Sequence, residues 1–175
     1  MWWRGSGMKM TTKQLTLCAV LAALALALSY IEGMFPPPIP LPGFKLGLAN
    51  IVTVYALYAL GATPALAILL VRVLLGAMFA GNASALIYSL LGGFAAILAM
   101  IALKRFEKLS IYGVSVGGAA AHNCGQIAAA VLTLGSAAPM AYLPALLIVS
   151  LFAGALTGLI GSLLLGNTFL KSVVK

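Results

Sequence analysis

The chain has 175 residues, of which 63% are hydrophobic and only 7% are charged. Soluble domains carry about 25% charged residues, so a protein that faces water on all sides is excluded, and the composition indicates an all-α integral membrane protein. The formal net charge of +8 does not indicate nucleic-acid binding, because the basic residues gather at the chain ends and in one short loop, where they set membrane orientation.

The apolar runs predict six transmembrane helices, since a helix needs about 20 apolar residues to cross the hydrocarbon. After the first run comes the loop MFPPPIPLPGFK, whose five prolines exclude a regular helix. Shorter polar or glycine-containing breaks separate the later runs. The expected helices are Gln14–Gly33, Leu46–Leu60, Thr63–Phe79, Ala83–Leu103, Ile111–Leu134 and Tyr142–Leu165.

The predicted six-helix bundle spans residues 14–166, between a cytoplasmic segment (1–13) and a basic tail (167–175). We expect residues 1–7 to be an added sequence, with Met8 as the native start. The positive-inside rule predicts a multi-pass protein of the inner (cytoplasmic) membrane, with both termini cytoplasmic and the proline-rich loop outside. The side with the termini holds Arg4, Lys9, Lys13, Lys104, Arg105, Lys108, Lys171 and Lys175, whereas the other side holds Lys45.

The first expected helix carries Ala19, Ala23 and Ala27 at four-residue spacing. Small residues at this spacing lie on one helix face, where they let another helix approach closely. Two interpretations follow: internal packing of the bundle, or a docking face for a partner membrane protein.

The stretch AHNCGQ places polar side chains in an otherwise apolar helix. His122 and Gln126 are four residues apart and share a helix face, whereas Asn123 points about 100° away. Interhelical hydrogen bonding is one explanation, and a ligand site is the other. A metal site is not favoured, because one histidine without carboxylate partners makes a poor ligand set.

Arg72 falls near the middle of the third expected helix, where an ionisable residue costs about 2.5–3.5 kcal/mol and is a functional candidate. Its structural alternatives are binding to helix-end carbonyls or pairing with Glu32. Polar groups from five helices face the outer half of the bundle, as expected for a pocket open to the outside. Two of these residues have a structural alternative that stays open. Asn82 can be a turn residue, and Lys45 can be an interfacial lysine whose charged end snorkels to water. The predicted substrate-binding residues are Lys45, Asn50, Arg72, Asn82, Tyr88, His122, Asn123 and Gln126.

Five blocks, in this order, carry a family resemblance: LPGFKLGLANIVTVYAL, RVLLGAMFAGN, YSLLGG, GVSVGGAAAHNCGQ and YLPALL. From about Lys13 to Leu165 the chain resembles the Gx transporter family, also called heptaprenyl diphosphate synthase component I. That family is similar in architecture to the S components of energy-coupling-factor vitamin transporters. The resemblance implies six helices, cytoplasmic termini, an outer-side pocket, and an alanine-spaced face for an energy-coupling membrane protein.

Members of the family are also associated with Rnf-type and other flavin-based redox systems outside the cytoplasm. The resemblance therefore implies a transporter that moves riboflavin, FMN or FAD across the membrane for extracytosolic flavoproteins. The resemblance also implies that the eight polar residues named above line the pocket. It implies flavin as the bound substrate and no required cofactor. The positive charge of the expected pocket favours an anionic ligand, because phosphate oxygens suit arginine and lysine.

Catalysis by this chain alone is not expected, despite the synthase name of the family. Hard cations such as Mg²⁺ require several oxygen ligands, but the chain has no aspartate, and its only acids are Glu32 and Glu107. Two further interpretations stay open: a non-catalytic membrane partner in prenyl diphosphate or quinone metabolism, and a transporter of another vitamin or small anion.

Overall fold

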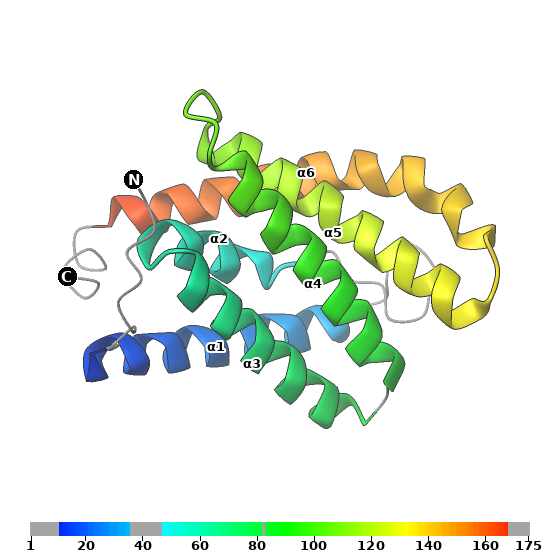
Figure 1. Cartoon of the computed structure of the whole chain (residues 1–175), viewed down its shortest axis with the longest axis horizontal. Helices are drawn as coiled ribbons and strands as arrows, with labels where there is room; N and C mark the ends of the chain where they lie inside the picture. The colour runs from blue at the N-terminus through cyan, green and yellow to red at the C-terminus, as the bar shows by residue number, and fades with distance from the viewer. Residues whose placement is uncertain (1–10, 36–46, 82, 168–175) are drawn as a thin grey trace.

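The computed structural model describes residues 11–35, 47–81 and 83–167, and all regular structure in these ranges is helical (Figure 1). This confirms the all-α prediction. Lys45 and Asn82 lie outside the described residues, as does most of the proline-rich loop. The elements are α1 (Thr12–Gly33), α2 (Asn50–Ala59), α3 (Ala62–Ala80), α4 (Ala83–Leu103), α5 (Ile111–Leu134), the 3-10 helix η1 (Ala138–Tyr142) and α6 (Leu143–Gly166).

Four segments of the described chain are long and apolar enough to cross a membrane: Thr12–Gly33, Ala62–Phe79, Ala83–Leu103 and Ala138–Gly166. The helix α5 has the length, with 24 residues, but its polar side chains lower its hydropathy below that of these four. The helix α2 has only 10 residues. The prediction of six membrane-spanning helices therefore stays a prediction for α2 and α5.

The short helix α2 lies inside the bundle. Its first eight residues, from Asn50 to Leu57, are all buried, and it packs against α1, α3, α4 and α6. Val54 and Ala56 are fully covered in the same core as Leu69 of α3 and Ile97 of α4. A helix enclosed by other helices does not need to span the hydrocarbon, which explains how α2 can be short.

The predicted start of the second helix was four residues too early. The prediction placed it at Leu46, whereas α2 begins at Asn50 after a turn at residues 48–49. Gly47 has a φ of +87°, a conformation that glycine adopts at little cost. The backbone N–H groups of Gly47 and Leu48 donate to the Glu32 carboxylate, at 2.6 and 3.0 Å. A side chain 15 residues away thus holds the chain in a turn where the local sequence favours helix.

The helix α5 lies between α4 and α6 and makes its most extensive contacts with both (Figure 1). Glycines allow this approach. A Cβ atom at Gly125 would overlap the Leu91 backbone carbonyl of α4, and a Cβ atom at Gly154 of α6 would lie 2.5 Å from the Val116 Cα atom. Because these neighbours are backbone atoms, no side chain larger than hydrogen fits at either position.

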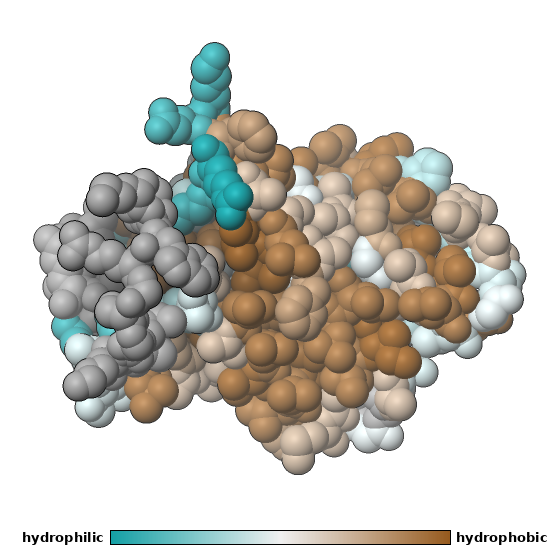
Figure 2. Space-filling view, in the orientation of Figure 1, coloured by the Kyte–Doolittle hydropathy of each residue, from teal (hydrophilic) through white to brown (hydrophobic). Residues whose placement is uncertain are grey.

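One end of the bundle is basic. The start of α1, the end of α6 and the α4–α5 loop lie at this end (Figure 1), where Lys104 donates to the Leu57 carbonyl oxygen at 2.7 Å and covers the Tyr58 ring. Lys104 thus ties the end of α4 to the end of α2. Figure 2 shows a hydrophilic α4–α5 loop beside a broad hydrophobic surface over α3 and α4. That contrast fits a membrane protein whose basic end lies in water.

We expect the Gly125→Ala variant to be less stable than the wild type by about 1–3 kcal/mol, the usual cost of overpacking. The added methyl group would force α4 and α5 apart at Leu91. Thermal unfolding of the detergent-solubilised protein measures the loss. Gly166→Ala is the matched control, because no atom of the described residues outside its own turn of helix lies within 4 Å of its added Cβ. Equal melting temperatures for the two variants would show that the α4–α5 contact tolerates a side chain.

Candidate functional site

Five buried polar side chains from α1, α2, α3 and α5 gather near the turn that precedes α2, and we call them the polar cluster. All five are at least nine-tenths buried. Neighbouring glycines and backbone contacts link them in space, as the following paragraphs describe. The polar cluster consists of Glu32, Asn50, Arg72, His122 and Gln126.

The His122 ring lies between two glycines. A Cβ atom at Gly92 of α4 would lie 2.9 Å from His122 Cε1 and 3.0 Å from the Gln126 Cγ atom. A Cβ atom at Gly47 would lie 3.4 Å from His122 Cδ2 and 2.8 Å from Asn50 Nδ2. His122 and Gln126 therefore share the face of α5 that meets α4, as their spacing predicts, and Asn50 joins them from α2.

Arg72 of α3 is only 6% exposed. It lies against α4, where a Cβ atom at Gly93 would be 3.5 Å from Arg72 Nη2. Glu32 of α1 is close enough for its charge to attract the guanidinium. Within the described residues, the Nε and Nη2 atoms of Arg72 have no hydrogen-bond partner, although buried N–H groups in proteins are almost always paired.

Glu32 belongs to the site, although the sequence did not place it among the substrate-binding residues. It is 8% exposed at the end of α1, and its carboxylate accepts the two backbone N–H groups that precede α2. The glycines at positions 47, 92 and 93 were also missed. The signals available were the glycines in the blocks KLGLAN and YSLLGG, which leave room for neighbouring polar side chains.

Two predicted residues make interhelical contacts beside the polar cluster. Asn123 Nδ2 donates to the Leu146 carbonyl oxygen at 2.9 Å and so joins α5 to α6. The Tyr88 hydroxyl lies 3.4 Å from the Thr133 hydroxyl and joins α4 to α5. Asn123 and Tyr88 therefore make hydrogen bonds between helices. The structure brings the other described candidates together in the polar cluster, namely Asn50, Arg72, His122 and Gln126.

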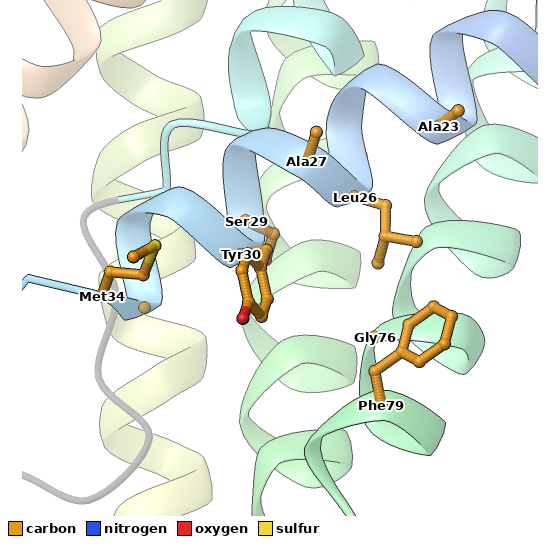
Figure 3. A pocket seen from close by; sticks show the side chains of 9 residues that line it. Ala23, Leu26, Ala27, Ser29, Tyr30, Met34, Gly76 and Phe79 are labelled. Carbon is orange, nitrogen blue, oxygen red and sulfur yellow. The ribbon is translucent and has the colours of Figure 1, made fainter.

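A separate groove lies between the C-terminal halves of α1 and α3 (Figure 3). Its volume is about 780 Å³, and its lining contains none of the six predicted substrate-binding residues that the structure describes. The groove is mainly apolar, so it offers a flavin or phosphate few hydrogen bonds. It is lined by Ala23, Leu26, Ala27, Ser29, Tyr30, Gly33, Met34, Gly76 and Phe79.

The alanine row of α1 points out of the bundle. Ala19, Ala23 and Ala27 are exposed, whereas Ala22 and Ala25 on the opposite face are buried. Packing within the described part of the chain therefore does not use this row. The structure leaves the small-residue face available to another membrane protein.

The helical arrangement has the fold of an S component. The chain is similar to a solved structure titled "Structure and mechanism of the S component of a bacterial ECF transporter", with a TM-score of 0.68 and 18% sequence identity. The match covers 90% of this chain and 95% of that chain.

The sequence also shows its family. The family model for heptaprenyl diphosphate synthase component I matches residues 21–164, and the chain belongs to that family. No curated protein matches the sequence. The family match covers all five residues of the polar cluster.

We expect the Glu32→Gln variant to lose about 1–3 kcal/mol of stability, the cost of breaking a buried hydrogen-bond arrangement. A glutamine can accept only one of the two backbone N–H groups of Gly47 and Leu48, and its own NH₂ group would face the other. Chemical or thermal unfolding measures the difference. Glu107→Gln, in the exposed α4–α5 loop, is the control for charge loss alone. If both variants unfold like the wild type, the Glu32 contacts do not stabilise the turn.

Proposed function

We propose that this protein is a membrane transporter that binds a flavin (riboflavin, FMN or FAD) at the polar cluster and supplies extracytosolic flavoproteins. The observation that carries the proposal is a nine-tenths buried arginine, beside amide and imidazole groups, within an S-component fold. An ionisable side chain at membrane depth is costly, and such residues mark ligand pathways by default.

The chemistry of the polar cluster suits the polar edge of a flavin ring. That edge carries both hydrogen-bond acceptors and a donor. The side-chain amides of Asn50 and Gln126 each offer a carbonyl acceptor and an NH₂ donor, and His122 offers a ring N–H. The apolar core around the cluster, including Leu69 and Ile97, suits the remainder of the ring system.

We place the polar-cluster end outside and the basic end in the cytoplasm. Lys13, Lys104, Arg105 and Lys108 lie at the end opposite the turn that precedes α2, and cytoplasmic loops carry an excess of such residues. In this orientation six helices span the inner membrane with both termini in the cytoplasm. The ligand then enters from the side where Lys45 is expected.

The exposed alanine row of α1 is the proposed docking face for an energy-coupling membrane protein. In a bilayer, helices associate through close packing of small residues rather than through hydrophobic burial. The row supplies small residues on the outside of the bundle, and the adjoining groove adds larger side chains such as Leu26, Tyr30 and Phe79 (Figure 3). The chain itself is proposed to have no catalytic role.

The family description favours a second candidate, a non-catalytic membrane partner in prenyl diphosphate or quinone metabolism. The same polar cluster would then bind the diphosphate of a lipid substrate. The absence of aspartate from the chain argues against magnesium-dependent synthesis by this subunit. A prenyl diphosphate that displaces flavin weakly or not at all would favour the transporter.

Purified protein is expected to bind at least one of riboflavin, FMN and FAD, with a flavin absorbance spectrum in the bound fraction. His122→Ala and Gln126→Ala should each weaken binding roughly 2- to 13-fold, the loss expected for one neutral hydrogen bond. Ser162→Ala, on the α6 surface, is the control. No measurable binding of any of the three flavins to folded, monodisperse protein would reject the proposal.

The docking face has a separate test. Ala23→Leu should leave flavin affinity in detergent unchanged and should lower flavin uptake several-fold in cells that supply the native partner, because leucine blocks close helix approach. Ala155→Leu, at an exposed site on α6, is the matched control and should leave uptake unchanged. Equal uptake by the two variants would place the docking face elsewhere.

A further inference from the structure

The side chain of Arg72 has one edge that the described part of the chain leaves unused. Its Nε and Nη2 atoms have no hydrogen-bond partner there, and the residue is only 6% exposed. Desolvated charged donors without an acceptor cost more than neutral ones. An unpaired guanidinium edge at this depth is therefore best explained by an acceptor that arrives from outside the described part of the chain.

The geometry of the guanidinium specifies the form of that acceptor. The Nε–H group and the neighbouring Nη2–H group lie on the same edge of the plane and point in nearly the same direction. Arginine uses such an edge to bind two oxygens of one carboxylate or phosphate group in a bidentate manner. A single carbonyl oxygen would satisfy only one of the two N–H groups.

Glu32 stabilises the charge of Arg72 without occupying this edge. Its carboxylate is near enough to attract the guanidinium, but the unpartnered Nε and Nη2 atoms show that it does not accept their hydrogen bonds. Its oxygens instead accept the backbone N–H groups of Gly47 and Leu48. A buried arginine thus has a counter-charge before ligand binds, and its bidentate edge stays available.

Two adjacent glycines of α4 face residues of the polar cluster. A Cβ atom at Gly93 would lie 3.5 Å from Arg72 Nη2 and 2.7 Å from Leu69 Cδ1, and the adjacent Gly92 faces His122 and Gln126. The glycine pair on α4 therefore lies between the guanidinium and the imidazole. A ligand that contacts both side chains would lie along this pair of glycines.

We propose that Arg72 is the specificity-determining residue for a phosphate group, and that the site prefers phosphorylated ligands over their unphosphorylated forms. This inference rests on the proposed function for the identity of the ligand, which is then FMN or FAD rather than riboflavin. The phosphate recognised by Arg72 belongs to a flavin or to a prenyl diphosphate, and the test separates these sources.

The experiment measures the affinities of riboflavin, FMN and farnesyl diphosphate for the purified, folded protein. FMN is expected to bind the wild type about 10- to 150-fold more tightly than riboflavin, the ratio expected for hydrogen bonds to a charged group. Arg72→Gln should remove this preference, so that its affinities for FMN and riboflavin become nearly equal. Arg72→Lys keeps the charge but loses the bidentate edge, so it should lose a large part of the preference.

The control is Arg105→Gln, which removes an arginine from the exposed α4–α5 loop and should leave all affinities unchanged. Equal affinities of the wild type for FMN and riboflavin overturn the inference, and this comparison stands even where a variant fails to fold. A loss by Arg72→Gln that is the same for both flavins also overturns it, because Arg72 would then contact the ring. Full FMN affinity in Arg72→Lys overturns the bidentate geometry.

The remaining outcomes separate this inference from the proposed function. If riboflavin binds as tightly as FMN, flavin transport stands and phosphate recognition fails. If neither flavin binds but farnesyl diphosphate binds in a manner that depends on Arg72, flavin transport fails and phosphate recognition is supported. If neither flavin nor farnesyl diphosphate binds, both are rejected.

Discussion

The close contact of α4 with α5 is the constraint on which the polar cluster depends. In hydrocarbon a polar side chain must find its partners within the protein, because water is absent. Gly92 and Gly125 let the two helices approach until backbone meets backbone, and His122 and Gln126 lie at this contact. The same helix presents Asn123 to α6. The polar stretch of α5 is thus enclosed on two sides, and this explains how a helix with low hydropathy persists in a membrane protein.

Charge in the interior is arranged around the turn that precedes α2. Glu32 is bound by two backbone N–H groups, and its negative charge lies near Arg72. Removing one member of a buried charge pair usually costs more than replacing both. Loss of the Glu32 charge would therefore leave the buried guanidinium of Arg72 without this nearby counter-charge. The short helix α2 begins at Asn50, directly after this turn.

Periodicity and composition predicted the helices well where each helix is long and apolar. The bounds of α4 and α5 agree with the prediction, and the shared face of His122 and Gln126 follows from their four-residue spacing alone. The start of α2 could not be predicted, because it depends on a carboxylate 15 residues earlier in the chain. The exposed alanine row was equally ambiguous in sequence, since small residues pack against internal and external helices alike. Asn123 and Tyr88 were predicted as ligand residues from their polarity and from the family resemblance, and neither reveals a partner such as the Leu146 carbonyl or Thr133.

The helix α1 connects the two surfaces on which the proposed function depends. One of its faces carries the exposed Ala19, Ala23 and Ala27, and its last turn carries Glu32, which holds the turn beside His122. A helix transmits displacement along its axis because its backbone hydrogen bonds are continuous. If a partner docks at the alanine row as proposed, a shift of α1 would displace the Glu32 carboxylate relative to α2 or break its two hydrogen bonds. The proposed docking face and the polar cluster thus share a single helix.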